Sequence, residues 1–228
     1  MAEVSPTGSP ACTLQTHTRL LFDCVERLAR GYVQSDHVKY CALEMYCRFA
    51  PAHEDAQIAQ VKRSTPPGRE REEGLRRLRA RLKQQEPLRA LTCLMIACKV
   101  AGERDANLLH PNVTPLTVQT LLETMGYMYT VGDIVRSEQR VLEQLEFRCF
   151  KTTTELELLE LLMSAIVLDN LQDSVRQGFV MHHFMTLLDA LYRSSVRLLG
   201  SALLNRAEIY VEFYRLIKGV REIHPRHR

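Results

Sequence analysis

The segment of residues 87–101, PLRALTCLMIACKVA, constrains the fold of this chain more than any other segment. Its apolar side chains recur at helical spacing and cover most of the helix circumference, as in helices that other helices surround on most sides. The segment has fifteen residues, which is short of the roughly 20 that a membrane span requires. We therefore expect a buried central helix, with Lys99 near its C-terminal end, where a cation suits the helix dipole.

The composition is typical of an ordinary globular protein. The chain has 228 residues, of which 46% are hydrophobic and 25% charged, and its net charge of +3 is too small to indicate nucleic-acid binding by the whole chain. No apolar run is long enough to cross a membrane, so no membrane partner is expected. The seven cysteines lie mostly within apolar helical patterns and form no CxxC pair. We expect reduced thiols of an intracellular protein, not disulfides or a structural zinc site.

Two helices are expected before the central one. Residues 1–16 are predicted to be a flexible leader, and apolar periodicity then indicates a helix at about residues 20–31. Ser35 or Asp36 can cap a second helix, and Pro51 is expected to end it because proline removes a backbone donor.

Two further helices are expected after the central one. Thr114 is followed by Pro115, a good cap and first-turn pair for a short helix that Gly126 closes. Thr130 and Asp133 have capping-box spacing and begin a helix that is expected to reach Phe147. Since no segment indicates a strand, the predicted fold class is all-α.

Residues 51–86 interrupt this pattern as a basic insertion. Residues 52–70 lack apolar periodicity and are expected to be a mobile loop. A basic amphipathic helix should follow, with a kink or break at Pro87. The residues from 62 to 83 include nine Lys or Arg and three Glu, which favours a solvated helix face and leaves open a docking surface for acidic protein or DNA phosphate. The candidate docking residues are Arg69, Arg71, Arg76, Arg77, Arg79, Arg81 and Lys83.

The part of the chain after residue 150 has room for about three helices, which are expected to begin near Thr154, Asp173 and Asn205. The predicted organisation is therefore a helical domain at 17–150 and a smaller helical domain at 151–228. Nothing in the sequence matches a nucleophile elbow, a phosphate loop or an HExxH zinc motif. We therefore expect no catalytic residue, no metal site and no cofactor, and a protein that is not an enzyme.

Two segments resemble motifs of the cyclin box, and they follow one another in the same order as in cyclins. They are LMIACKVAGE at residues 94–103 and MYTVGDIVRSEQRVLEQLEFR at residues 128–148. In cyclins this box is five helices around a buried third helix, and a lysine at the end of that helix binds a cyclin-dependent kinase together with a glutamate of the fifth helix. By motif position, these two residues are Lys99 and Glu138, and the leucine near the start of the third helix is Leu88.

The resemblance also implies partners and a location. It implies a non-catalytic regulatory protein that binds a cyclin-dependent kinase or recombination proteins, as one chain of a hetero-complex. Residues 121–148 are most similar to a divergent member of the family associated with meiotic crossover maturation. A nuclear location on meiotic chromosomes is therefore expected, with the cytoplasm as a second location.

Differences from the cyclin pattern leave two other functions open. Cyclins pair an arginine of the first helix with an aspartate of the second, and Thr18 and Cys47 stand at those positions here. This difference, together with a second domain too short for five helices, favours a kinase-independent scaffold that recruits recombination or replication proteins. The basic residues at 62–83 would instead support a cyclin fold that contacts DNA, although direct binding of nucleic acid is the least expected of the three.

Overall fold

The structure is a computed structural model that describes residues 36–104 and 113–149, together with residues 156–157, 160–161, 164, 181–182, 185–186 and 188–189. The chain divides into two units, one of His17–Leu162 and the other of Met1–Thr16 with Met163–Arg228. The predicted leader and the helix at 20–31 lie outside the described residues, as do most of the helices predicted after residue 150.

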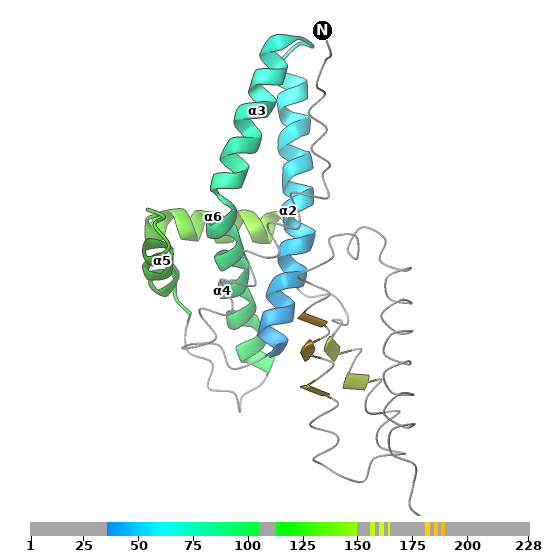
Figure 1. The fold of residues 1–228 in the computed structure, drawn as a ribbon, viewed down its shortest axis with the longest axis vertical. Helices are drawn as coiled ribbons and strands as arrows, with labels where there is room; N and C mark the ends of the chain where they lie inside the picture. The colour runs from blue at the N-terminus through cyan, green and yellow to red at the C-terminus, as the bar shows by residue number, and fades with distance from the viewer. Residues whose placement is uncertain are drawn as a thin grey trace, which may run out of the picture. The chain divides into compact units, whose positions relative to one another are not determined.

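The first unit is built from helices. They are α2 (Asp36–Ser64), α3 (Arg69–Gln84), α4 (Glu86–Arg104), α5 (Pro115–Thr124) and α6 (Val131–Gln144), shown in Figure 1. No strand occurs within residues 36–104 and 113–149. The predicted all-α class is confirmed.

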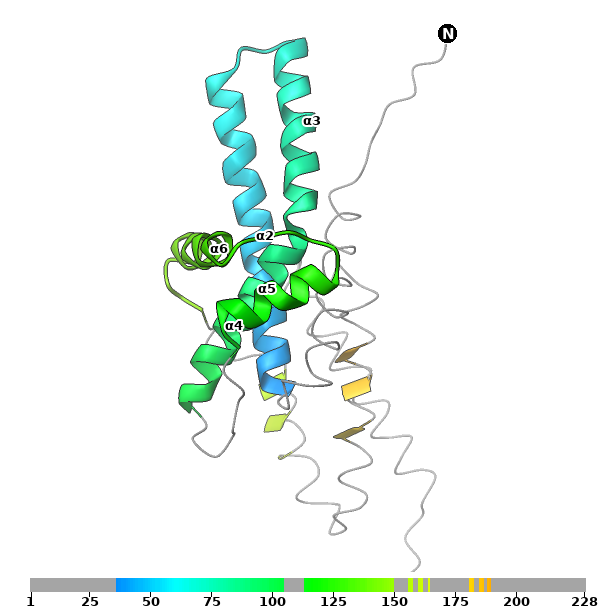
Figure 2. The same cartoon turned by 90° about the vertical axis from the view of Figure 1, so that its left-hand side faces the viewer.

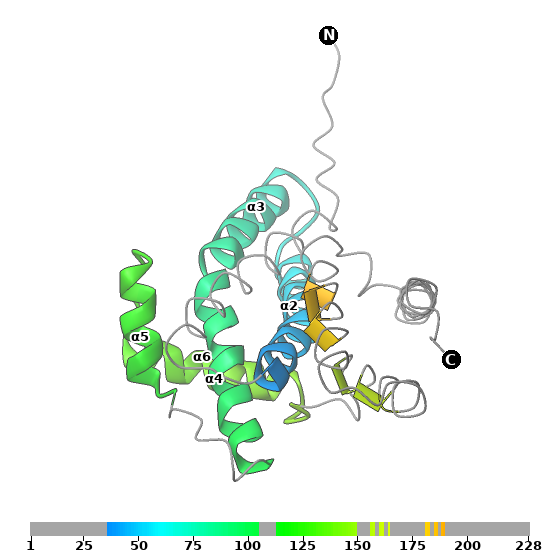
Figure 3. The same cartoon turned by 60° about the horizontal axis from the view of Figure 1, so that its bottom comes forward.

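The central position of α4 is also confirmed. All of its side chains from residue 86 to residue 98 are buried, and Leu91, Leu94 and Met95 are 0% exposed. Helix α4 packs against α2, α5 and α6, and Figure 3 shows it between α5 and α2. Because neighbouring helices cover it on several sides, nearly every position of the helix can be apolar.

Helix α2 does not end at Pro51, so this prediction is wrong. The helix continues to Ser64, although proline cannot form the helical hydrogen bond to the carbonyl four residues earlier. Tertiary packing explains the continuation, because α3 runs back along the second half of α2 (Figure 2). The position of Gly74 shows how closely the helices approach, since a Cβ atom there would lie 3.5 Å from Val61 Cγ1.

The mobile loop expected at residues 52–70 is accordingly replaced by a helical hairpin. Its turn spans only residues 65–68 and includes Gly68 at a φ of 141°, a backbone conformation that favours glycine. Arg71 holds the turn, because its Nε donates to Thr65 O at 2.8 Å and its Nη2 donates to Lys62 O at 3.0 Å. These bonds satisfy carbonyl groups at the C-terminal end of α2 that have no partner within the helix. The helices α3 and α4 are separated at Gln85, two residues before the predicted position, and Pro87 lies in the first turn of α4, where a proline is tolerated.

Both predicted caps after the central helix are present. Thr114 caps α5, and Gly126 follows that helix with a φ of 85°. Thr130 and Asp133 form the predicted capping box at the start of α6. Helix α6 ends at Gln144 rather than at Phe147, because Glu146 and Phe147, with φ values of 51° and 57°, both lie in the left-handed region and cannot continue the helix.

Candidate functional site

Lys99 and Glu138 meet where α4 and α6 pack together. Lys99 is the first exposed side chain after the buried run of α4, and its Nζ lies 2.5 Å from Glu138 Oε1. The Lys99 side chain is 46% exposed and that of Glu138 is 17% exposed. An ion pair this exposed stabilises a fold by only about 0–1 kcal/mol. Both residues therefore keep polar groups that a partner could reach without unfolding the domain.

A buried hydroxyl pair fixes α6 against α4 beneath this ion pair. Thr92 Oγ1 lies 3.0 Å from Ser137 Oγ, and both residues are buried. Thr92 precedes Lys99 by two helical turns on the same side of α4, and Ser137 directly precedes Glu138. The core contact therefore determines where the two charged residues come together.

Two exposed valines extend the surface along α6. Val131 is 40% exposed and Val135 is 47% exposed. With Glu138 they have the spacing i, i+4, i+7, which places all three on one side of the helix. We call the set Lys99, Val131, Val135 and Glu138 the α4–α6 patch. Neither valine was among the site residues expected from the sequence, although their spacing from Glu138 could have identified them.

The third residue assigned by motif position, Leu88, does not join this patch. It lies at the start of α4, with only 6% of its surface exposed. Its carbonyl oxygen is 2.6 Å from Thr92 Oγ1. Leu88 thus belongs to the core in this structure, and the α4–α6 patch contains two of the three residues assigned by the motifs.

The candidate basic docking residues separate into two groups. Three of them make contacts within the hairpin: Arg71 binds the carbonyl groups at the end of α2, Arg77 Nε lies 3.0 Å from Glu73 Oε1, and Arg81 Nη2 lies 3.4 Å from Gln57 Oε1. The other four are exposed on one side of α3, and of these Arg76 also pairs with Glu73; they are Arg69, Arg76, Arg79 and Lys83. The sequence could not reveal the contacts of Arg71 and Arg81, because they depend on the path of α2 beyond Pro51, whereas Arg77 and Glu73 have the i, i+4 spacing of one helix.

A buried cluster at the base of the hairpin was not predicted from the sequence. His53 is 4% exposed and stacks on Phe49, with ring centroids 5.1 Å apart and planes inclined by 15°. The Arg89 guanidinium lies 5.9 Å from the Phe49 ring centroid. Burial, followed by the nearby charges of Arg89 and Arg140, lowers the pKa of His53 to about 4. Burial also lowers the pKa of Arg89, to about 10, and this group stays protonated at neutral pH.

The described part of the chain shows no group of three or more His, Cys, Asp or Glu residues that could hold a metal ion. Within that part, no helix combines the length and the apolar character needed to span a membrane. The polar groups of the α4–α6 patch can bind a protein partner by charge-assisted hydrogen bonds.

Comparison with known proteins bears on the same helices. Residues 76–149 match the family model for the cyclin N-terminal domain. The matched segment begins within α3 and contains α4, α5, α6 and the whole α4–α6 patch. Searches among curated proteins and among solved structures find no match. The match shows that the segment containing the buried central helix α4 is similar to the cyclin N-terminal domain.

Proposed function

We propose that this chain is a non-catalytic regulatory protein that binds a cyclin-dependent kinase through the α4–α6 patch. The similarity to the cyclin N-terminal domain supports a cyclin-like regulatory role with protein partners such as kinases. The observation that supports kinase binding through this patch is the ion pair between Lys99 and Glu138, which joins α4 and α6 at an exposed edge.

The ion pair offers both kinds of polar group that a partner's backbone needs. A lysine ammonium has three donors and a carboxylate has several acceptor sites, so one bond between Lys99 and Glu138 leaves donors and acceptors unused. A kinase loop can place its carbonyl groups against Lys99 and its amide groups against Glu138. Such charge-assisted bonds are strong once the partner has displaced water.

The exposed valines supply the apolar part of the same surface. Val131 and Val135 lie one helical turn apart on α6, next to Glu138. Met128, just before this helix, is 86% exposed. An apolar segment of a partner can be buried here, and its burial would desolvate the neighbouring ion pair. A central desolvated cluster of this kind carries most of the free energy of many interfaces.

Co-precipitation with a panel of cyclin-dependent kinases tests the proposal. Lys99→Ala and Glu138→Ala should each weaken binding by about 2–5 kcal/mol, which is thirtyfold or more in affinity. The matched control is Arg136→Ala, because Arg136 forms another exposed ion pair on α6, at 2.7 Å to Asp133, outside the patch. Circular dichroism should show that all three variants keep their helices.

A charge-exchanged variant separates partner binding from a structural role. The double substitution Lys99→Glu with Glu138→Lys keeps an intramolecular ion pair but exchanges the positions of donors and acceptors. It should fold like the wild type and still fail to bind the kinase. Normal binding by this variant would contradict the assigned roles, and a wild-type chain that binds no kinase would favour the second candidate.

The second candidate is a kinase-independent scaffold that recruits recombination or replication proteins. Cys47 favours it, because this buried thiol stands where cyclins carry an aspartate. The neighbouring Arg48 is hydrogen-bonded within the domain, since its guanidinium donates to Arg148 O at 3.0 Å and to Cys149 O at 2.8 Å. A scaffold of this kind would keep partners other than kinases when Lys99 is replaced by Ala.

We further propose that the protein acts in meiotic recombination, on chromosomes in the nucleus. The support is the similarity of residues 121–148 to cyclin N-terminal domain-containing protein 1, which is associated with crossover maturation. Purification of the tagged chain from meiotic cells, followed by mass spectrometry, tests this assignment. The assignment is refuted if no recombination protein co-purifies with the chain from meiotic cells and only kinases co-purify with it from mitotic cells.

A further inference from the structure

The helical hairpin presents a surface that the proposed kinase contact does not use. The second half of α2 and the whole of α3 extend away from α4, α5 and α6 (Figures 1 and 2). Leu78 and Leu82 of α3 are buried, and the rest of that helix is largely exposed. The hairpin therefore has an outer side that is free of the helical core.

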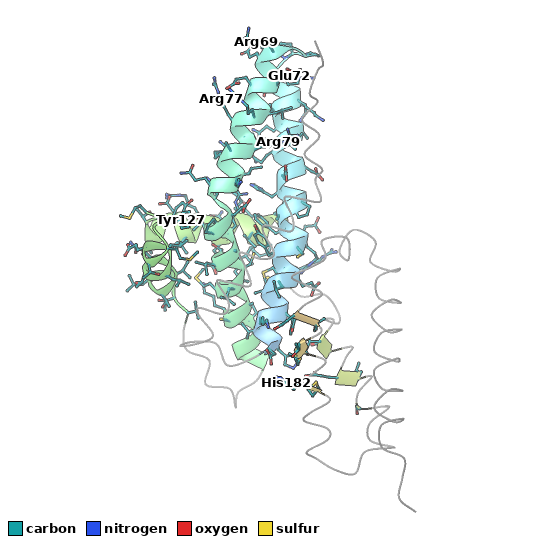
Figure 4. The ribbon with its side chains drawn as sticks, in the orientation of Figure 1. Arg69, Glu72, Arg77, Arg79, Tyr127 and His182 are labelled. Atoms are coloured by element: carbon teal, nitrogen blue, oxygen red, sulfur yellow. The ribbon has the colours of Figure 1, made fainter. Side chains whose placement is uncertain are left out.

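Five charged side chains form a continuous line on this outer side. They follow one another at intervals of 3, 4, 3 and 4 residues, an arrangement that keeps them on one side of a helix over about 21 Å. All five are exposed, and Figure 4 labels three of them along α3. We call them the basic stripe, and they are Arg69, Glu72, Arg76, Arg79 and Lys83.

Most of the cations in the basic stripe have no partner among the residues that the structure describes. Arg76 Nη2 lies 2.6 Å from Glu73 Oε2. Among residues 36–104 and 113–149, no hydrogen bond or ion pair engages the charged groups of Arg69, Arg79 or Lys83. Three like charges along one line repel one another, and an anionic partner relieves this repulsion.

Glu72 decides which anionic partner fits. It interrupts the line between Arg69 and Arg76, where the evenly charged backbone of a nucleic acid would place a phosphate near a carboxylate. A protein helix can instead present a lysine or arginine at that position and carboxylates at the others. The intervals of 3 and 4 residues are also those at which two packed helices meet.

We propose that the basic stripe binds an acidic α-helix of another protein, laid along α3. Carboxylates of this helix face Arg69, Arg76, Arg79 and Lys83, and one cation faces Glu72. The contact is independent of the α4–α6 patch, which lies on other helices. Because exposed charges dominate the contact, its affinity falls as salt concentration rises.

Fluorescence anisotropy with the full chain tests this proposal. The probe is a labelled synthetic helical peptide that carries Glu at the 3–4 spacing and one Lys opposite Glu72. The comparison peptide has the same composition, with its Glu residues distributed around the helix. We expect the first peptide to bind at least fivefold more tightly than the second. Equal binding of the two peptides would overturn the proposed helix, since net charge alone would then explain the affinity.

Substitutions identify the surface. Arg79→Gln with Lys83→Gln should weaken binding of the peptide at least tenfold. The matched control is Arg63→Gln with Arg77→Gln, which removes the same charge from the hairpin outside the stripe and should change the affinity less than threefold. Circular dichroism verifies folding of each variant. Equal losses in the two double variants would place the binding elsewhere.

Glu72→Lys distinguishes a protein helix from nucleic acid. This variant should bind the original peptide more weakly and should regain affinity for a peptide with Glu at the facing position. A 20-base-pair DNA duplex serves as the competing probe. If the duplex binds the wild type more tightly than the acidic peptide does, and Glu72→Lys strengthens that binding further, the partner is nucleic acid and the proposal is wrong.

Discussion

Protonation of His53 should destabilise the domain in mildly acidic solution. The imidazole is buried against Phe49, and burial with the charges of Arg89 and Arg140 lowers its pKa from 6.5 to about 4. A side-chain hydrogen bond with Gln144 opposes this shift. Because the pKa in the folded state lies below that in the unfolded state, the unfolded chain binds more protons between pH 6.5 and pH 4. The free energy of unfolding must therefore fall as the pH is lowered through this range.

The size of the effect follows from the two pKa values. With 6.5 for the unfolded chain and about 4 for the folded chain, the linkage relation gives a loss of about 2 kcal/mol between pH 7 and pH 4.5. A loss of about 3 kcal/mol is the limit below pH 4, since each pKa unit corresponds to about 1.4 kcal/mol. For a urea dependence of about 2 kcal/mol/M, the unfolding midpoint should fall by about 1 M between pH 7 and pH 4.5.

Urea unfolding followed by circular dichroism at both pH values measures this loss. His53→Phe keeps an aromatic ring on Phe49 but cannot be protonated, so it should remove about 2 kcal/mol of the pH dependence. His37→Gln serves as the control, because it removes a histidine whose side chain is 45% exposed in the same unit. If His53→Phe loses as much stability as the wild type between pH 7 and pH 4.5, the inferred desolvation of His53 is wrong.

Three further predictions concern the fold. Leu94→Ala should lower the free energy of unfolding by about 2–5 kcal/mol in urea denaturation, because Leu94 is fully buried in α4, and Leu94→Asp should abolish the cooperative transition. Gly74→Ala should raise the melting temperature, with a stabilisation of about 0.5–1 kcal/mol, since the added Cβ meets Val61 at an ordinary contact distance of 3.5 Å. A lower melting temperature would show that α2 and α3 leave no room for the added methyl group. Thr130→Ala should lower the free energy of unfolding by about 1 kcal/mol through loss of the α6 cap, and an unchanged urea midpoint would show that the cap contributes nothing.

Local rules were sufficient for several elements of the fold. The apolar run at 87–101 predicted α4 as a buried central helix, because only a helix surrounded by others can be apolar on nearly all sides. Thr114 and Thr130 predicted the starts of α5 and α6, because a cap acts through backbone groups within the next three residues. These features depend on neighbours in sequence, so one chain read alone reveals them.

The course of the insertion required the tertiary structure. Pro51 locally disfavours a helix, but α2 continues through it because α3 packs along α2. His53, Gln57 and Val61 follow at intervals of four residues, and all three are partly or fully buried. That spacing is a helical signal, but it is weak because two of the three residues are polar. Only the position of α3 shows why these side chains are sheltered.

The candidate site also combines both kinds of information. The resemblance to cyclins selected Lys99 and Glu138 from the sequence, whereas their contact across 39 positions of sequence depends on the crossing of α4 and α6. The burial of Leu88 follows from the predicted central helix, whereas the tertiary structure alone showed that Val135 is exposed. Sequence spacing determines which side chains share one side of a helix, but it cannot determine which side another helix will cover, and burial decides which residues remain available to a partner.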